Sequence, residues 1–452
     1  MSDEQSTARA AVLRREILAK VAEYYDVAHR PADFIPGETF VNYGGRVYDE
    51  RELQSAVEAI LDFWLTDGPR AETFSARLGQ YVGLKRVLTV NSGSSANLVA
   101  MTTLRSRQLD AAACRRPLKN GDEVITPAAT FPTTVAPIVQ NQLMPVFIDC
   151  KVGTYNINVD LLEAALSEKT RAVFVPHILG NPVEMDRVMA FAEAHNLYVI
   201  EDTCDALGSR YDGVACGAFG HLSTFSFYPA HHITTGEGGA VGTNDKKLYH
   251  IAHSIRDWGR DCWCDHKSHR DGECGKRFDW EIPGLGEPYD HRYYFTEIGY
   301  NLKMTDIQAA IGLPQLDKLP DFVAARQRNF KVLYEGLARY ADHLVLPVWS
   351  PKAEPAWFAF TIAVREDAPF TRRDLNDFLR EHKVETRYLF AGNILHQPGY
   401  RNIPHRVATP MPETERVLKS AFFIGVYPGM DDARLAYILQ VFEDFFKARG
   451  LH

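Results

Sequence analysis

The sequence lacks any uninterrupted apolar run of about 18 residues, which is the length that a membrane-spanning helix needs. It also lacks an excess of positive charge, since 50 lysines and arginines stand against 58 aspartates and glutamates. A nucleic-acid-binding protein would instead carry a basic surface. The N-terminus is acidic at once and has no small-residue cleavage site after an apolar core, so we expect no signal peptide and a cytoplasmic location. These absences argue against a membrane protein and against a nucleic-acid partner.

Cysteine is scarce and odd in number, and the sequence contains no internal repeats or low-complexity segments. An odd count in a chain expected in the cytoplasm argues against a disulfide framework. Residues 258–290, which are polar and show little periodicity, hold three of the cysteines. A long segment of this kind inside a compact domain is usually functional or disordered, so the clustering needs a chemical explanation. The seven cysteines are Cys114, Cys150, Cys204, Cys216, Cys262, Cys264 and Cys274.

Short apolar runs alternate with amphipathic stretches of about 10 to 15 residues through the middle of the chain. This alternation predicts a largely parallel sheet with helices on both faces. Two helices, at 8–29 and 51–65, precede it. After Leu319 the pattern predicts a long helix and two strands, FAFTIAVRE (358–366) and VETRYLF (384–390). We therefore expect an N-terminal helical segment (1–60), a large domain (61–319) that includes the 258–290 insert, and a small α+β domain (320–452).

Three polar loops follow predicted strands: NSGSSAN (91–97), EDTCDALG (201–208) and SFYPAHHITTGEGG (226–239). Ligands of parallel sheets collect at the carboxyl ends of the strands, so we expect these loops to converge on one site. In the first loop Gly93, Ser94 and Ser95 begin a helix, whose free N–H groups and dipole suit a phosphate. A plain helix cap made of small residues is the alternative.

The other two loops carry polar groups that would complete a cofactor site. Asp202 ends a strand, where a carboxylate can hold a pyridine nitrogen protonated and so make a pyridoxal-type cofactor an electron sink. Taken by itself, Asp202 is better explained as a simple cap. Ser226 can supply a second phosphate ligand, and Gly238 and Gly239 allow a tight backbone turn. Phosphate cradle, strand-end aspartate and glycine-rich turn, in this order, point jointly to pyridoxal phosphate.

Residues from about 35 to 445 resemble the nucleotide-sugar aminotransferase family of fold-type I pyridoxal phosphate (PLP) enzymes. The resemblance implies an aspartate aminotransferase-like fold, with a mostly parallel seven-stranded sheet and a smaller C-terminal α+β domain. The motifs that carry it are GSSAN (93–97), EDxxxxxG (201–208), SFxxxxxxTxGEGG (226–239) and GYNLKMTDIQAAIGLPQL (299–316).

His231 departs from that family, in which the residue five after the serine is a lysine that forms the internal Schiff base. The sequence has no lysine between Lys169 and Lys246 that could replace it. The departure resembles the subfamily of nucleotide-diphospho-4-keto-6-deoxyhexose 3-dehydrases, which use pyridoxamine phosphate (PMP) and an iron–sulfur cluster. We predict that His231 removes a proton from the methylene carbon of the cofactor while a hydroxyl leaves the substrate. His232 is expected to be structural, and an inactive or regulatory homologue is the alternative.

The same resemblance explains the cysteines, because that subfamily holds a [2Fe–2S] cluster on four of them, and thiolates are the ligands such clusters need. Nine residues separate the last two, a longer spacing than the family's. Cys204 lies two residues after Asp202, which would put the cluster beside the cofactor. Zinc held by the same thiolates, or by His266 or His269, is one alternative, and redox-active cysteines are another. The predicted cluster ligands are Cys204, Cys262, Cys264 and Cys274.

The resemblance also implies further contacts. Asp205, Tyr228 and Phe358 fall where these dehydrases depart from the aminotransferases, and we expect them to adapt the site to deoxygenation. Phe131 is a candidate to stack on the pyridine ring, with core packing as the alternative. Asn301 lies where the family reaches a cofactor phosphate across a subunit interface, which predicts a homodimer.

Arg387 and Tyr388 are candidates to bind the substrate's diphosphate or sugar, although a surface arginine without a ligand is an equally good interpretation.

The sequence thus predicts a 3-dehydrase of a nucleotide-diphospho-4-keto-6-deoxyhexose in deoxysugar biosynthesis. Its electrons would come singly from an NAD(P)H-dependent flavin/iron–sulfur reductase or a ferredoxin-type donor. A cluster-free PLP-dependent dehydratase or transaminase is the first alternative, and a non-catalytic sugar-nucleotide-binding protein is the second.

Overall fold

A computed structural model describes residues 3–29, 33–109, 115–262 and 276–451. Its main sheet has eight strands in the order β1-β9-β8-β5-β4-β2-β3-β16. From β8 to β16 neighbouring strands are parallel, whereas β9 runs antiparallel to both β8 and β1. The strands are β1 (Arg86–Val90), β2 (Glu123–Pro127), β3 (Met144–Ile148), β4 (Thr170–Pro176), β5 (Tyr198–Asp202), β8 (Leu222–Ser226), β9 (Gly239–Thr243) and β16 (Arg406–Val407).

The predicted mostly parallel sheet is confirmed, with one addition. Seven strands come from residues 86–243, and the two-residue β16 adds an eighth beside β3. The apolar side chains of each strand alternate between two buried layers, as in a sheet covered on both faces. Val124 packs with Phe174 in one layer, and Ile125 packs with Val173 in the other.

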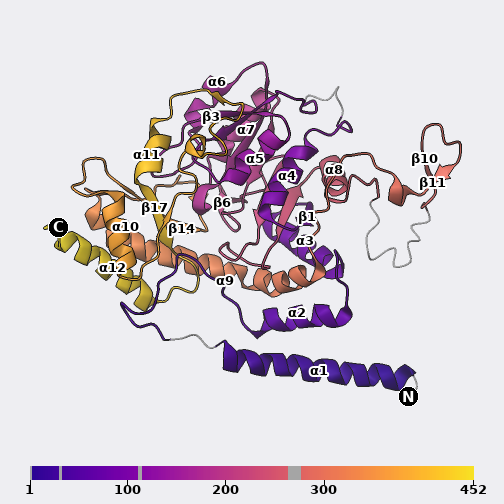
Figure 1. Ribbon diagram of the computed structural model, residues 1–452, viewed down its shortest axis with the longest axis horizontal. Coiled ribbons are helices and arrows are strands. Elements are labelled where there is room, and N and C mark those ends of the chain that lie inside the picture. The colour runs from indigo at the N-terminus through magenta and orange to yellow at the C-terminus, as the bar shows by residue number, and fades with distance from the viewer. Residues whose placement is uncertain (1–2, 30–32, 110–114, 263–275, 452) are drawn as a thin grey trace.

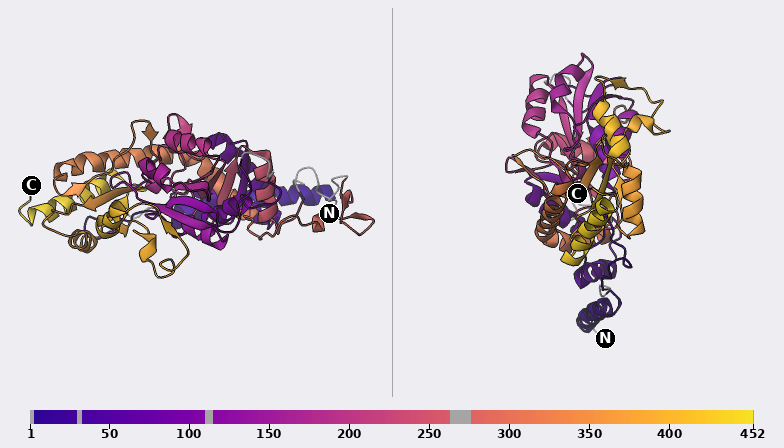
Figure 2. Two further views of the ribbon diagram at one scale, coloured as in Figure 1. Left: turned by 90° about the horizontal axis from the view of Figure 1, so that it is seen from above. Right: turned by 90° about the vertical axis from the view of Figure 1, so that its left-hand side faces the viewer.

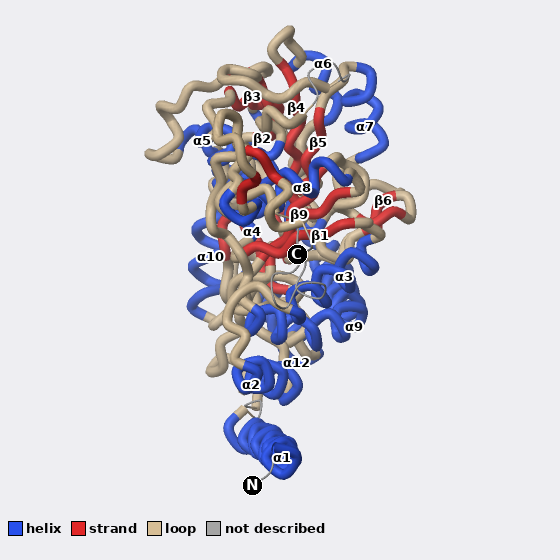
Figure 3. The backbone as a smooth tube through the Cα atoms, turned by 90° about the vertical axis from the view of Figure 1, so that its right-hand side faces the viewer, coloured by secondary structure: helices blue, strands red, loops and turns tan. Residues whose placement is uncertain are grey.

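Helices cover both faces of this sheet (Figure 3). One layer contains α4 (Gly93–Thr103), α5 (Pro132–Gln140) and α8 (Lys246–Arg256). The opposite layer contains α3 (Pro69–Val82), α6 (Leu162–Ala165), α7 (Met185–Ala194) and the first half of α9 (Asp306–Leu337).

A second, four-stranded antiparallel sheet lies in the C-terminal part, in the order β12-β14-β17-β15. Its core is rich in stacked rings, such as Phe330 on Trp357 and Tyr340 on Phe446, each pair with centroids 3.8 Å apart. Its elements are β12 (Leu344–Val345), β14 (Ala359–Val364), α10 (Arg372–Glu381), β15 (Arg387–Tyr388), α11 (Pro412–Ser420), β17 (Ala421–Gly425) and α12 (Asp432–Lys447).

Helix α9 joins the two parts of the protein. It is one continuous helix of 32 residues, although it contains Pro314 and Pro320. The sequence pattern predicts a long helix only after Leu319, whereas α9 already begins at Asp306. The expected domain boundary after Leu319 therefore falls inside α9, and the three-part division of the chain stays a prediction.

The N-terminal helices lie below the body of the protein (Figures 1 and 2). Helix α1 (Asp3–Ala28) packs against α2 (Glu50–Asp62), and none of its residues is buried. Helix α2 ends three residues earlier than expected because Phe63 adopts a left-handed conformation with a φ of 54°. Among the described residues, no helix combines the length and the apolarity that crossing a membrane requires.

The remaining elements are short. A hairpin in the 258–290 insert projects from the side of the molecule (Figure 1). These strands are β6 (Arg210–Tyr211), β7 (Val214–Ala215), β10 (Trp280–Glu281), β11 (Pro288–Tyr289) and β13 (Ala353–Glu354). The 3₁₀ helices are Val159–Leu161, Ile178–Gly180, His291–Tyr293, Ala338–Tyr340 and Ile394–His396.

Candidate active site

A pocket of about 460 Å³ opens at the carboxyl ends of β1, β5 and β8. The loops 91–97, 201–208 and 226–239 all contribute to its wall, so they converge as expected. The C-terminal part closes the pocket from the other side with Phe358, Arg387 and Tyr388. The site therefore lies between the two sheets.

Asp202 is a buried carboxylate at the base of this pocket, 7% exposed. Its Oδ2 accepts hydrogen bonds from Asn97 Nδ2 and from the Thr134 hydroxyl, both at 2.9 Å. Its Oδ1 accepts the backbone N–H of Cys204 at 3.3 Å. The three donors hold the carboxylate in one orientation, which suits it to bind a protonated ring nitrogen.

The N-terminus of α4 forms a close-fitting cradle beside Asp202. Gly93 and Ser94 line the pocket, and a Cβ built on Gly93 would lie 2.9 Å from Ser226 Oγ and 3.0 Å from Cys204 Sγ. Only glycine fits there. Ser95, in contrast, does not line the pocket, because its backbone N–H bonds to the Ser92 side chain at 3.1 Å as a helix cap.

His231 and Asp205 face each other across the pocket wall, with Nδ1 and Oδ1 3.4 Å apart. Burial, then the nearby charge of Arg326, lowers the pKa of His231 to about 3. Burial, then the charge of Asp202, raises the pKa of Asp205 to about 7. In mildly acidic solution the contact therefore joins a neutral imidazole to a neutral carboxyl group. His231 is thus a free base at neutral pH.

Helix α9 holds the loop that carries His231 at three points. Gln308 Nε2 donates to the carbonyl of Glu237 at 2.8 Å, and Gln315 Oε1 accepts the N–H of Thr234 at 3.2 Å. Arg326 Nη2 donates to the carbonyl of His231 at 3.2 Å. The three helix residues are spaced by two and three turns, so they share one face of α9.

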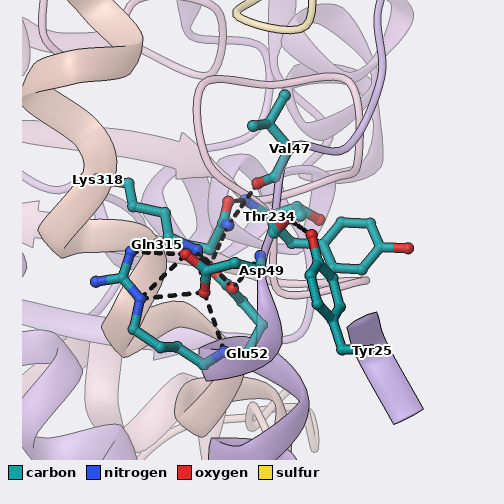
Figure 4. Close-up of polar contacts among 9 residues, drawn as sticks. Tyr25, Val47, Asp49, Glu52, Thr234, Gln315 and Lys318 are labelled. Atoms are coloured by element: carbon teal, nitrogen blue, oxygen red, sulfur yellow. Dashed lines mark hydrogen bonds and ion pairs between the residues drawn. The ribbon is translucent and has the colours of Figure 1, made fainter. Parts of the chain in front are cut away.

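The orientation of Gln315 is fixed from the N-terminal segment (Figure 4). Its Nε2 donates to the carbonyl of Val47 at 2.9 Å and to Glu52 Oε1 at 2.7 Å, which turns Oε1 toward Thr234. Lys318 Nζ binds both carboxylate oxygens of Glu52 at 2.6 Å. A buried network thus connects α2 to the loop that carries His231.

Aromatic and basic side chains form the outer wall. Phe131 is 50% exposed, and Phe358 packs beside the His231 ring at 5.4 Å. Tyr228 lines the same wall and is half exposed. Arg387 pairs with Glu385, and the guanidinium of Arg372 lies 3.7 Å from the Tyr388 ring centroid.

Only two of the four predicted metal ligands, Cys204 and Cys262, lie among the residues that the structure describes. Cys204 lines the pocket, whereas Cys262 does not. Cys264 and Cys274 lie outside the described residues, as do His266 and His269 of the zinc alternative. Within the described ranges, no group of three or more His, Cys, Asp or Glu side chains is arranged to hold a metal ion.

A model of the DegT/DnrJ/EryC1/StrS aminotransferase family matches residues 47–443. The chain belongs to this family. The predicted family resemblance and fold class are therefore confirmed.

Two relatives within the family cover nearly the whole chain. The lipopolysaccharide biosynthesis protein RfbH of Salmonella typhimurium is 47% identical over 434 residues, which is 96% of this chain and 98% of that protein. The dTDP-4-dehydro-2,6-dideoxy-D-glucose 3-dehydratase of Saccharopolyspora spinosa is 44% identical over 429 residues, 95% of this chain and 91% of that protein. The second name agrees with the predicted class of enzyme.

A solved structure extends the comparison. The GDP-4-keto-6-deoxy-D-mannose 3-dehydratase of E. coli with bound hydrated PLP superposes with a TM-score of 0.78 at 26% identity. The match covers 89% of this chain and 100% of that chain. The fold of the whole catalytic unit is thus shared with that family member.

Most of the expected site residues line this pocket, but Asn301 does not. It is exposed and pairs through its backbone with Asp257, away from the pocket of its own chain. The expected residues that line the pocket are Gly93, Ser94, Phe131, Asp202, Cys204, Asp205, Ser226, Tyr228, His231, Phe358, Arg387 and Tyr388.

The structure adds residues that the sequence interpretation missed. Asn97 and Thr134 hold Asp202, and Arg326 holds His231. His177 lines the pocket, with Nδ1 accepting the N–H of Val183 at 3.0 Å and Nε2 3.1 Å from a carboxylate oxygen of Glu201. His177 directly follows a strand-like run and Asn97 ends the GSSAN motif, so both carried a signal that could have singled them out. Thr134 and Arg326 stand within helical patterns that carry no such signal.

Proposed function

We propose that this protein is a PMP- and [2Fe–2S]-dependent 3-dehydrase that removes the C3 hydroxyl of a nucleotide-diphospho-4-keto-6-deoxyhexose. One observation carries the proposal. His231 shares a pocket with the buried carboxylate Asp202, and no lysine stands among the described residues that line this pocket. A transaminase of this family needs a lysine there, whereas a dehydrase needs a proton-transfer group that leaves the cofactor free.

The described residues fit a pyridoxamine phosphate. Asp202, with its three hydrogen-bond donors, would hold the ring nitrogen, and Gly93, Ser94 and Ser226 would hold the phosphate at the start of α4. Phe131 would cover the ring. Bound there, the cofactor supplies an amine that condenses with the 4-keto group and a ring that accepts electrons.

His231 is the proton-transfer residue in this proposal. Because Nδ1 faces Asp205, Nε2 would be the nitrogen available to take the proton. The imidazole accepts the methylene proton and passes it to the departing hydroxyl, which leaves as water. Phe358 and the small-domain wall keep bulk water from the transfer, while Arg387 and Tyr388 would bind the diphosphate or the sugar.

The iron–sulfur cluster is the second part of the proposal. Removing the C3 hydroxyl requires two electrons, and a [2Fe–2S] cluster passes them one at a time from a reductase or ferredoxin-type partner. Cys204 supports this assignment because it lines the pocket itself, next to the cofactor cradle. Cys262, Cys264 and Cys274 would supply the other thiolates.

The alternative is a cluster-free dehydratase or transaminase of a nucleotide sugar, and the two can be separated directly. The protein is purified anaerobically and its iron and acid-labile sulfide are measured. We expect two of each per chain, with turnover that needs both PMP and a reductant. Zinc in place of iron, or turnover without a reductant, would contradict the cluster-dependent reaction.

A further inference from the structure

Arg326 is a buried cation without a carboxylate partner. It lies in α9 and is 1% exposed. Its guanidinium donates only to backbone carbonyls: to His231 at 3.2 Å, to Trp357 at 3.2 Å and to Phe358 at 3.0 Å. Its Nε is buried and has no hydrogen-bond partner, and in the described part of the chain it forms no ion pair. A buried charge left unpaired is costly, so its place beside the site calls for a functional reason.

The three carbonyls belong to the two parts of the protein. His231 is in the loop after β8 of the large sheet, whereas Trp357 and Phe358 lead into β14 of the small one. One rigid guanidinium therefore ties the catalytic loop to the wall that packs against its imidazole, where the rings of His231 and Phe358 are 5.4 Å apart. A guanidinium is suited to binding these carbonyls together because it is planar and carries several N–H donors in a fixed arrangement. The ammonium group of a lysine lacks this geometry.

The charge of Arg326 also acts on the imidazole. Burial lowers the pKa of Arg326 to about 9, so it is still a cation at neutral pH. The other ionisable groups around His231 are Asp205 at 3.4 Å, Tyr228 in edge contact and the neighbouring His232. Of these only Asp205 would favour an imidazolium. The charge of Arg326, which does not line the pocket, acts in the opposite direction.

We propose that Arg326 is a positioning residue that fixes His231 between the two parts of the protein and holds a positive charge near its imidazole. The proposal deepens the proposed function and rests on it. An imidazolium formed beside this charge returns its proton readily, so the proton taken from carbon passes to the leaving hydroxyl and departs as water. Arg326 itself neither gains nor loses a proton.

The test compares two variants. Arg326→Met removes the positive charge, whereas Arg326→Lys keeps the charge but loses the planar set of N–H donors. Histidine Cε1 is labelled with ¹³C in the oxidised full-length protein, and the His231 signal is assigned by its loss in His231→Asn. In the unmodified protein this signal should not titrate between pH 8 and 5.5. Both signals are then followed down to roughly pH 4, and the titration of Arg326→Met should begin at least one pH unit above that of the unmodified protein.

Arg326→Lys should leave the His231 signal close to that of the unmodified protein but lower kcat by roughly ten- to a hundredfold, with KM for the sugar nucleotide little changed. The matched control is Arg328→Met, two residues along α9, whose guanidinium binds the carbonyl of Met430; it should change neither readout. An unchanged His231 titration in a folded Arg326→Met protein overturns the proposal. If that variant does not fold, an unchanged kcat in Arg326→Lys overturns it. Failure of the proposed function is recognised separately, because His231→Asn would then keep its turnover.

Discussion

Asn97 and Asp202 are joined by a buried hydrogen bond of 2.9 Å, and the hydroxyl of Thr224 fixes its direction by donating to Asn97 Oδ1 at 2.6 Å. The amide therefore always turns its NH₂ group toward the carboxylate. Asp202 thus depends on a residue of α4 that does not itself line the pocket.

Asn97→Ala should weaken the binding of PMP. Loss of a hydrogen bond to a buried charge costs about 1–3 kcal/mol, which corresponds to roughly five- to 150-fold in Kd. The change is measured by titrating the protein with PMP and following cofactor absorbance. Asn120→Ala, at an exposed position outside the pocket, is the control and should bind normally. Equal affinities in the two variants would mean that Asp202 does not hold the cofactor ring.

His231→Asn should keep cofactor binding and slow proton exchange at the cofactor methylene by roughly a hundredfold or more. Since the pKa of His231 is lowered to about 3, the exchange rate of the unmodified enzyme should not fall between pH 8 and 5.5 through protonation of this residue. Deuterium exchange followed by NMR measures both effects. Unchanged exchange in His231→Asn would refute the role of the residue.

Substitution of a single proposed cluster ligand by serine should lower the iron content and abolish reductive turnover, because each ligand supplies a thiolate. The four ligands are Cys204, Cys262, Cys264 and Cys274. Cys216→Ser serves as the control, since Cys216 is buried outside the pocket and should leave the iron unchanged. A normal cluster in Cys274→Ser would show that the longer spacing before this residue had led to the wrong fourth ligand.

The homodimer is open to a complementation test. If Asn301 reaches the cofactor phosphate of the neighbouring subunit, chains carrying His231→Asn mixed with chains carrying Asn301→Ala should regain activity. Half of the dimers would be mixed and each would hold one intact site, giving roughly a quarter of the normal rate. A fully active monomer in sedimentation at assay concentration would instead indicate that Asn301 only caps a turn of its own chain.

Acid should destabilise the protein through buried histidines. The pKa values of His221 and His253 are lowered to about 4 and that of His231 to about 3, in each case mainly by burial. Below about pH 6.5 the unfolded chain therefore binds more protons than the folded one, and stability falls as the pH drops toward 4. Each such residue contributes up to about 1.4 kcal/mol per pH unit. Thermal unfolding at pH 7 and pH 5 measures the loss, which His221→Gln should reduce.

Local sequence patterns were enough to predict the sheet and most of the residues that line the pocket. The strands stand out because they are short apolar runs buried on both faces, and the loops stand out because their glycines and serines follow those runs. Arg326 was missed because a lone arginine in a helical pattern normally marks a solvated face, and only tertiary packing buries it. Pro314 and Pro320 concealed the continuity of α9, and two residues of β16 are too few to form a pattern.

The network around Glu52 has a consequence for where the catalytic unit begins. Glu52 is 4% exposed, and its carboxylate accepts hydrogen bonds from Lys318 and Gln315. Gln315 in turn binds the backbone of the loop that carries His231. A chain starting at residue 61 would leave an ammonium group and an amide facing a void where a carboxylate had been. The shortest fragment worth expressing for activity therefore starts upstream of Val47, and a tag or fusion partner belongs at the free end of α1 rather than in the connection between α1 and α2.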